Sequence, residues 1–329
     1  MKLIREVKEQ EWRDFVREIP GGSVFQTPEM ASVYESTVRH EPVSVFAVEE
    51  GRIQGLVLAS LIWSGGWPMK LFSSRCIVQG GPLLAKSSCA PTLLSGLDDL
   101  VSKRALYTEI RNLRKPVEVV PLFESSGYSF AAYLNYHLDL RKSEEEIWSG
   151  MSKGRRKGIS RAEKTGLEVT EITEERQIDE FYDILKKTYS GLGMPLADES
   201  LFTSAFRILR PLQEARFLLC ISEGRTVACR AVLLFGKTMY DWYAGSVAEE
   251  RAKKADEFLV WNILKWGISR GYETFDFGGA GSPDEEYGPR EFKRRFGGEM
   301  VEPGRFEKVY KPTQFSFSKK MFRFYRRLL

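Results

Sequence analysis

Arg230 is the residue whose position most directly implies chemistry, because it interrupts the apolar run LCISEGRTVACRAVLLF (219–235). A buried guanidinium needs a carboxylate or phosphate partner, since desolvating it alone is very costly. Two partners are open: an anionic group of a bound ligand, or Asp241 in the apolar segment that follows. Tyr240 and Tyr243 lie beside Asp241, and these three side chains either orient an amine or serve packing.

A second group of reactive side chains follows a glycine-rich turn. Gly278, Gly279 and Gly281 allow the backbone to turn sharply and to approach a ligand closely, and Asp276 comes directly before them. The run PREFKRRF (289–296) comes shortly after the turn. Its cationic side chains either face a ligand or form a solvated basic surface: Arg290, Lys293, Arg294 and Arg295.

The composition indicates a folded two-domain protein. The 329 residues are 43% hydrophobic and 29% charged, with a net charge of +4. The N-terminus is charged, so we expect no secretory signal. The sequence has no run of eighteen apolar residues, so we expect no membrane span. We therefore expect a cytoplasmic protein.

Few residues of this sequence could bind a metal ion. His40 and His137 are the only histidines, which argues against a histidine-based zinc site and against a Ser-His-Asp triad. The four cysteines form no CxxC pair and are typical of reduced thiols: Cys76, Cys89, Cys220 and Cys229. We expect no metal.

The elements that carry these residues belong to a pattern that occurs twice. FAVEEGRIQGLVLASLI (46–62) and LCISEGRTVACRAVLLF (219–235) are each a strand, a Glu-Gly-Arg turn and a second strand. Periodicity predicts the elements around the second hairpin as strand 167–172, helices 178–189 and 198–209, strand 238–247, helix 256–270, strand 272–277, a short helix near 289–296 and strand 305–310. It predicts those of the first half as strand 2–7, helices near 8–18 and 27–38, a strand near 69–78, a helix near 91–104 and strand 107–113. We infer two copies of one α/β unit, joined near residues 141–150.

This element order resembles the GNAT acyltransferase fold, and its repetition resembles the Fem-type (FemABX) peptidyltransferases. Three stretches carry the resemblance: HLDLRKSEEEIWSGMSKGRRKGISRAEKTGLEV (137–169), YAGSVAEERAKKADEFLVWNILKWGISRGYETFDFGG (243–279) and GPREFKRRFGGEMVEPGRFEKVY (288–310). The similarity covers the linker and nearly the whole second half, and it is only topological in the first half.

The resemblance implies an α/β (α+β) fold of two tandem GNAT-like domains, each a twisted mixed sheet flanked by helices. We place the first domain at 1–145 and the second at 146–312. A basic amphipathic helix at 313–329 would pack back on the first domain. Only a short helix separates Gly193 from Ala215, so the coiled-coil arm of some Fem proteins is expected to be absent.

Fem proteins transfer amino acids from aminoacyl-tRNA to the peptide of a cell-wall precursor, so the resemblance implies an aminoacyltransferase. In this fold the strand ending at Asp276 diverges from strand 238–247 and leaves a cleft. Phe292-Lys293 matches the Phe-Lys of Fem active sites, where Lys293 would stabilise the oxyanion formed when an amine attacks an ester. The expected substrate-binding residues are Arg230, Tyr240, Asp241, Tyr243, Asp276, Gly278, Gly279 and Arg290.

Coenzyme A is disfavoured as the donor. GNAT enzymes that use it carry Arg/Gln-x-x-Gly-x-Gly/Ala before a helix, where bare backbone N–H groups bind the pyrophosphate. RAKKADEFL (251–259) has Lys254 and Asp256 at the two small positions. A carboxylate there would cap the same N–H groups and repel an anion. The alternatives that remain are a coenzyme-A-dependent N-acyltransferase and a non-catalytic protein that binds RNA or a membrane surface.

Two basic clusters, 151–164 and 319–329, could contact tRNA phosphates or an anionic membrane surface that holds a lipid-linked, amine-bearing acceptor. The residues expected to make such contacts are Arg155, Arg156, Lys157 and Arg294. In the tail, Met321, Phe322, Tyr325 and Leu328 form one helical face, and Lys319, Arg323, Arg326 and Arg327 form the other. The alternative for the tail is a helix whose apolar face docks on the first domain. We expect a monomer with peripheral contact at the inner face of the membrane.

Overall fold

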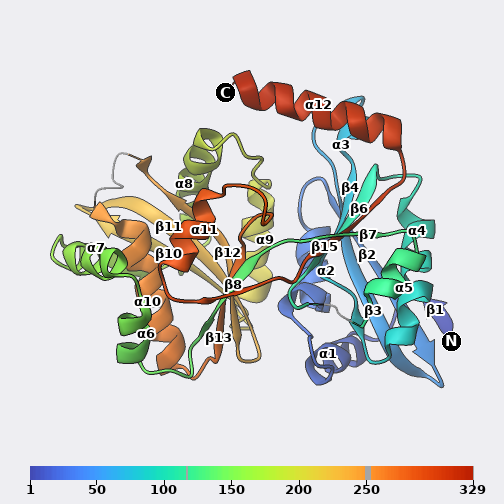
Figure 1. Ribbon diagram of the computed structural model, residues 1–329, viewed down its shortest axis with the longest axis horizontal. Coiled ribbons are helices and arrows are strands. Elements are labelled where there is room, and N and C mark those ends of the chain that lie inside the picture. Colours follow the sequence, from blue (N-terminus) through green and yellow to red (C-terminus); the bar gives the residue numbers. More distant parts are fainter. Residues whose placement is uncertain (116–117, 249–252, 329) are drawn as a thin grey trace. The chain divides into compact units, whose positions relative to one another are not determined.

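The protein, seen here in a computed structural model that describes residues 1–115, 118–248 and 253–328, forms two compact units (Figure 1). Unit 1 comprises Met1–Tyr133 and Glu302–Leu329, and unit 2 comprises Leu134–Val301. Each unit has its own mixed sheet with helices on both faces, which confirms the predicted fold class. No helix of the described residues has both the length and the apolar character needed to cross a membrane.

The boundaries of the two units differ from the predicted 1–145 and 146–312. Strand β8 (Asn135–Asp139) pairs antiparallel with β13 (Thr274–Gly279) and β14 (Glu299–Val301), so it belongs to unit 2. Strand β15 (Arg305–Val309) pairs with β6 (Tyr107–Asn112) and β7 (Ser129–Ala131), so it belongs to unit 1. The reason is that backbone groups are satisfied by the strands that lie beside them, not by the strands that are nearest in sequence.

Unit 1 has a sheet in the order β1-β2-β3-β4-β6-β15-β7, with β5 pairing β3. Its remaining elements are β1 (Lys2–Ile4), α1 (Glu9–Glu18), α2 (Pro28–Glu35), β2 (His40–Glu49), β3 (Arg52–Ile62), α3 (Met69–Ser73), β4 (Arg75–Gly80), β5 (Leu83–Leu84), α4 (Ala90–Val101), α5 (Val120–Ser125) and α12 (Pro312–Leu328). The predicted strand near 69–78 is wrong in its first half, which is helix α3. Pro68 is the N-cap of this short helix, and the backbone N–H of Lys70 donates to the carbonyl of Gly66 at 2.9 Å.

Unit 2 has a sheet in the order β14-β8-β13-β12-β11-β10-β9. Its remaining elements are α6 (Glu144–Gly150), α7 (Lys153–Glu163), β9 (Glu168–Glu171), α8 (Gln177–Gly191), α9 (Glu199–Leu209), β10 (Ala215–Ser222), β11 (Arg225–Phe235), β12 (Thr238–Ser246), α10 (Ala255–Ser269) and α11 (Gly288–Arg294). Asp198 caps α9 by accepting from the backbone of Ser200, as its type predicts. Between Gly193 and Ala215, all of which the structure describes, α9 is the only helix, so a coiled-coil arm is absent there.

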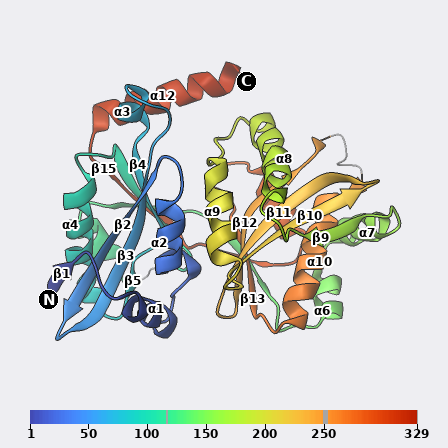
Figure 2. The ribbon, with the colours of Figure 1, turned by 180° about the vertical axis from the view of Figure 1, so that it is seen from behind.

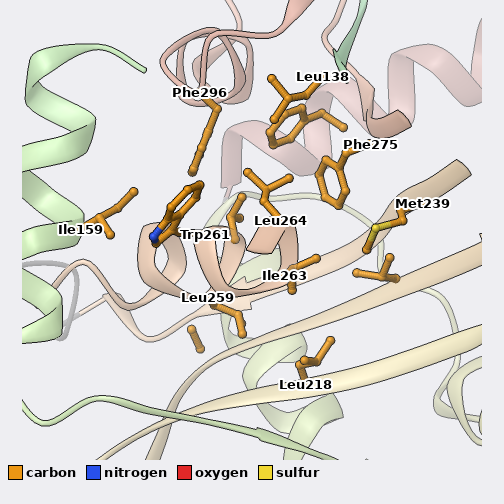
Figure 3. Packing of buried hydrophobic residues seen from close by; sticks show 14 of the residues in the cluster. Leu138, Ile159, Leu218, Met239, Leu259, Trp261, Ile263, Leu264, Phe275 and Phe296 are labelled. Atoms are coloured by element: carbon orange, nitrogen blue, oxygen red, sulfur yellow. The ribbon is translucent and has the colours of Figure 1, made fainter. Parts of the chain in front are cut away.

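Helix α10 forms the centre of the unit 2 core (Figure 3). Leu259, Ile263 and Leu264 are fully buried on this helix, and they belong to the same apolar cluster as Phe275 of β13 and Phe296 just after α11. Helix α10 covers one face of the sheet and α7 packs against it, whereas α8 and α9 cover the other face (Figure 2). This packing fixes both β13 and α11, the two elements that carry the glycine-rich turn and the basic run.

The two units differ at their parallel strand pairs. In unit 1, β4 and β6 stay paired over five positions, from Cys76 and Thr108 to Gly80 and Asn112. In unit 2, β12 and β13 are paired over three positions only, and the last pair is Tyr240 with Asp276. Beyond that point β12 continues to Ser246 and β13 to Gly279 without pairing to each other. The divergence predicted between these two strands is therefore present.

Helix α12 packs on unit 1. Its Phe317 contacts Phe72 with ring centroids 5.5 Å apart, and its Phe315 contacts Tyr107 at 4.8 Å. The hydroxyl of Ser318 donates to the Phe72 carbonyl at 2.7 Å. Of the predicted apolar and basic faces, the side chains of Phe322, Tyr325, Leu328, Arg323, Arg326 and Arg327 lie outside the described part of the chain.

The pairing of β15 within unit 1 leads to a prediction about Phe306 of this strand. Phe306 is fully buried, and its ring centroid lies 4.6 Å from that of Phe123 and 5.2 Å from that of Phe130. Phe306→Ala should destabilise unit 1 by about 3–5 kcal/mol, because it leaves a cavity in the middle of that core. Hydrogen exchange should accelerate in β6 and β7 while β8 and β13 keep their protection. The matched variant Phe275→Ala should show the reverse pattern. Equal acceleration in both units would contradict this partition of the chain.

Candidate functional site

The candidate site lies where β12 and β13 part. Asp241 follows the last paired residue of β12, and Phe277 and Gly278 follow that of β13. Gly278 has φ +71°, and a Cβ at this position would lie 3.3 Å from the carbonyl oxygen of Asp241 and 3.9 Å from Nζ of Lys293. Only glycine meets both demands without strain, and its absent side chain leaves room for the backbone carbonyl of Asp241 and the ammonium of Lys293 beside it.

Asp276 holds the turn from inside. It is buried, and its Oδ1 accepts from the backbone N–H of Gly278 at 2.7 Å and from Nδ2 of Asn135 at 2.8 Å. Its Oδ2 lies 3.4 Å from Nε2 of His137. Both carboxylate oxygens therefore face protein groups of β8 and β13. This corrects the prediction that Asp276 binds substrate.

Lys293 projects from α11 onto the glycine turn. Its Nζ donates to the carbonyls of Gly278 at 3.0 Å and Gly279 at 2.7 Å. Burial lowers the pKa of Lys293 to about 8, although the nearby carboxylates of Asp241 and Asp276 act in the opposite direction. An ammonium has three N–H donors, so one donor remains for a ligand.

The partners of Arg230 are two carboxylates of the protein. Its side chain is 3% exposed, and its two terminal nitrogens donate to Oδ2 of Asp241 and, at 2.5 Å, to Oδ1 of Asp256. Arg230 is thus a structural ion pair and not the binder of a ligand anion. The partner Asp256 was predicted to cap α10, but the N-cap residue is Lys254, which makes no side-chain cap bond.

Asp241 is the group at the divergence that keeps a free acceptor. Its Oδ2 pairs with Arg230, whereas its buried Oδ1 meets no hydrogen-bond donor among the described residues. Burial raises the pKa of Asp241, although Arg230 and Lys293 oppose this rise. A buried carboxylate with a raised pKa and an oxygen that lacks a hydrogen-bond partner has the properties of a general base.

Two of the predicted contact residues hold α11 in place. Arg290 donates to the backbone carbonyls of Ala280 at 2.8 Å, Ser282 and Pro283 at 3.4 Å, so it clamps the loop and does not bind substrate. Arg155 is 4% exposed, and it cannot reach tRNA or a membrane as predicted.

Arg155 instead joins three elements of unit 2. It pairs with Glu257 of α10 at 3.0 Å, donates to the carbonyl of Phe292 at 2.9 Å, and stacks on the rings of Phe292 and Phe296 at 4.3 Å each. Phe292 thereby supports the helix that carries Lys293 and is itself a packing residue.

The remaining predicted residues divide between packing and surface. Tyr240 is buried, and the Tyr243 ring meets the Phe202 ring edge-on at 4.8 Å. Arg294 is exposed and pairs with Glu291 at 2.6 Å. Lys157 is exposed, and Arg156 is half-buried with a bond to the Ser149 carbonyl at 3.3 Å; these two stay candidates for phosphate contact.

A cavity of about 740 Å³ opens elsewhere in unit 2, around the β11–β12 turn and the C-terminal end of α10. Its lining is basic, but Arg216 pairs with Glu171 at 2.5 Å and Lys237 donates to the Gly271 carbonyl at 3.0 Å. Cations at a helix C-terminus are favourable by themselves. The cavity lies away from Asp241 and Lys293, and we assign it no role in the site.

Comparison with known proteins shows which proteins unit 2 and the whole chain resemble. Residues 151–294 match the family model described as acetyltransferase (GNAT) domain, and all of them lie in unit 2. No curated protein sequence matches the chain.

Solved structures match nearly the whole chain. FemX has a TM-score of 0.72 and 14% identity, covering 96% of this chain and 99% of that chain. A tandem GNAT protein from the clavulanic acid biosynthesis pathway has a TM-score of 0.62 and 11% identity, covering 94% and 98%. The C-terminal domain of a putative lysylphosphatidylglycerol synthetase from Agrobacterium fabrum has a TM-score of 0.60 and 13% identity, covering 95% of each chain. The resemblance read from the sequence is confirmed at the level of the fold.

The ion pairs of Arg230 generate a prediction about stability and pH. Arg230→Met should lower the free energy of unfolding by about 3–5 kcal/mol, because it leaves the buried Asp241 without a cation. The folded-state pKa of Asp241 then rises further above its unfolded value, so the folded variant binds more protons than its unfolded chain, and its stability falls as pH rises. Urea unfolding should show a deficit that is larger at pH 8 than at pH 5.

The matched control for this variant is Arg294→Met, which removes an exposed ion pair with Glu291. Its cost should stay below about 1 kcal/mol at either pH. A loss for Arg230→Met as small as that of the control would mean that the buried pairs do not stabilise the fold.

Proposed function

The chain has the tandem-GNAT fold of the Fem-type proteins, and from this premise we propose that it transfers an aminoacyl group from aminoacyl-tRNA to an amine of a cell-wall peptide or a similar acceptor. Unit 2 carries the GNAT acyltransferase domain, so it is the unit in which the chemistry is expected. The observation that carries the proposal is that Asp241 and Lys293 lie at the point where β12 and β13 part, and that the Asp241 carboxylate and the Lys293 ammonium are close enough to shift each other's pKa.

The two residues have complementary tasks in acyl transfer. The acceptor amine attacks the ester carbonyl, a C–N bond forms, and the C–O bond to the terminal ribose breaks. Asp241 Oδ1 takes the proton that the amine loses and returns it to the departing ribose oxygen. The third N–H of Lys293 donates to the oxyanion that develops on the carbonyl. The products are an amide and a deacylated tRNA end.

The elements around the pair keep it in position. The carbonyls of Gly278 and Gly279 orient the Lys293 ammonium, and Arg230 binds Oδ2 of Asp241 and leaves the buried Oδ1 unpaired. Groups held in this way need no reorganisation when charge develops, which is the main source of electrostatic catalysis.

The start of α10 supports a donor without a pyrophosphate at this position. Asp256 and Glu257 occupy the first turn of the helix, where a carboxylate already satisfies the positive end of the helix dipole. Both are ion-paired, to Arg230 and to Arg155. Arg251 and Ala252 of the same motif lie outside the described residues. Acyl-coenzyme A is the second candidate donor, because residues 151–294 match the acetyltransferase (GNAT) domain model.

The donor can be identified with the purified full chain. Labelled aminoacyl-tRNA or labelled acyl-coenzyme A would be offered together with an amine-bearing wall peptide. We expect label to move from the tRNA to the peptide amine, with release of a free tRNA end. Transfer from coenzyme A alone would overturn the proposed donor, and no transfer from either donor would favour a binding protein.

Lys293 provides the sharper test of the mechanism. Lys293→Met should lower kcat about a hundredfold, the loss of one preorganised donor. The substitution should also lower the free energy of unfolding by about 1 kcal/mol for each lost hydrogen bond to the carbonyls of Gly278 and Gly279. The ammonium of Lys293 is therefore not a merely exposed group. For the wild type, kcat should fall above about pH 8 as Lys293 loses its proton. Lys293→Arg should move that alkaline limb upward, since a guanidinium stays charged.

The control is Arg295→Met. Arg295 is exposed and pairs with Glu291 at 2.8 Å, and the expected change in kcat is small. Equal small effects for Lys293→Met and Arg295→Met would show that the basic run is a solvated surface without a catalytic role.

A further inference from the structure

Large apolar side chains are exposed on two touching segments of unit 1. In the segment 63–73, which ends in α3, Trp67 is 84% exposed, Met69 60% and Leu71 47%. On α12, Phe317 is 50% and Met321 is 53% exposed. Helices α3 and α12 contact each other and lie side by side in both views (Figures 1 and 2). We call residues 63–73 and 312–321 the α3–α12 tip.

The tip is a well-built region of the fold. The Ser73 hydroxyl accepts from the backbone N–H of Ser64 at 2.9 Å and donates to the Ser64 carbonyl at 3.0 Å. The Ser318 hydroxyl links α12 to the Phe72 carbonyl at 2.7 Å. These bonds close the segment on itself and join it to α12. The exposure of Trp67 is therefore a property of the folded unit.

The charge of the tip has one sign. Neither 63–73 nor 312–329 contains an acidic residue. Lys70 lies 4.1 Å from the centre of the Trp63 ring, and Lys319 lies 4.0 Å from that of Phe315. Lys319 also lies 3.9 Å from the carboxylate of Glu307, which belongs to β15 and not to the tip. Cations and aromatic rings are thus interleaved on one surface.

This combination selects one kind of partner. Exposed Trp and aliphatic side chains gain free energy when they enter the boundary between lipid headgroups and acyl chains. Lysines keep their stems in the same layer and their ammonium groups at the phosphates. Juxtaposed cations without acids are attracted to anionic lipids and not to zwitterionic ones. A protein partner would instead be expected to need a contiguous apolar face without interleaved charge.

We propose that the α3–α12 tip inserts shallowly into the surface of a bilayer that contains anionic phospholipid. Trp67, Met69 and Leu71 enter the interface together with Phe317 and Met321, and Lys70, Lys319 and Lys320 contact the phosphates. The tip is a surface anchor, since no described helix could cross the bilayer. The inference does not depend on the proposed transfer reaction, because its test measures binding alone.

The test uses the full chain and vesicles. Co-sedimentation is measured with vesicles of phosphatidylcholine alone and of phosphatidylcholine with phosphatidylglycerol. We expect binding to the mixed vesicles only, weakening as salt rises. Trp67→Ser combined with Met69→Ser should reduce partitioning about tenfold or more, from the apolar area withdrawn from the interface. Lys319→Glu with Lys320→Glu should remove the preference for anionic lipid.

A matched control comes from unit 2, where Leu212 is 53% exposed. Leu212→Ser should bind as the wild type does. Trp67, Met69 and Leu212 are exposed, so circular dichroism and melting should not change in their serine variants. Quenching by brominated lipid should be lost in Trp67→Phe, which identifies the inserted ring. Equal binding to both vesicle types, unaltered binding of the Trp67→Ser/Met69→Ser variant, or a Trp67-dependent dimer without vesicle binding would overturn the proposal.

Discussion

The ion pairs of Arg230 are the constraint on which unit 2 depends. A cation buried between a central strand and the start of α10 must be neutralised locally, and Asp241 and Asp256 do this from two different elements. The pair with Asp256 ties α10 to the sheet, and the pair with Asp241 opposes the rise that burial causes in the pKa of that carboxyl group. The same interaction therefore stabilises the fold and tunes the acidity of Asp241 at the strand divergence.

Other cations of unit 2 have a related role at a greater distance from the site. Arg290 organises the loop after β13 through backbone carbonyls, and Arg155 joins α7 to α10 and α11. Both lie in sequence stretches that look like solvated basic surface. Their effect is to fix α11, and with it the direction from which Lys293 meets the glycine turn. A lysine on a freely moving helix could not remain aimed at a developing charge.

Helices and hairpins, which depend on residues close together in the chain, could be predicted from the sequence. Periodicity predicted α8 and α9, and the Glu-Gly-Arg turns predicted both hairpins. The assignment of β8 to unit 2 and of β15 to unit 1 had no local signal, because strand pairing is decided by partners distant in sequence. The burial of Arg155 could not be read from a basic helix for the same reason, since its partner Glu257 lies on another element. The sequence predicts Asp256 as a carboxylate at a helix start, but only the fold shows that it forms an ion pair with Arg230.

The contrast between the units explains why chemistry is expected in only one of them. In unit 1 the parallel strands stay paired through Gly80 and Asn112, and the neutral amide of Gln26 donates to the carbonyl of Gly81 at 2.9 Å. The described residues of unit 1 thus offer no strand divergence for a carboxylate and an ammonium to share. Its distinctive feature is the exposed tip on α3 and α12. If both proposals hold, one copy of the repeated fold performs the reaction at its opened strands and the other binds the membrane surface, so the two tasks are divided between the two units of a single chain.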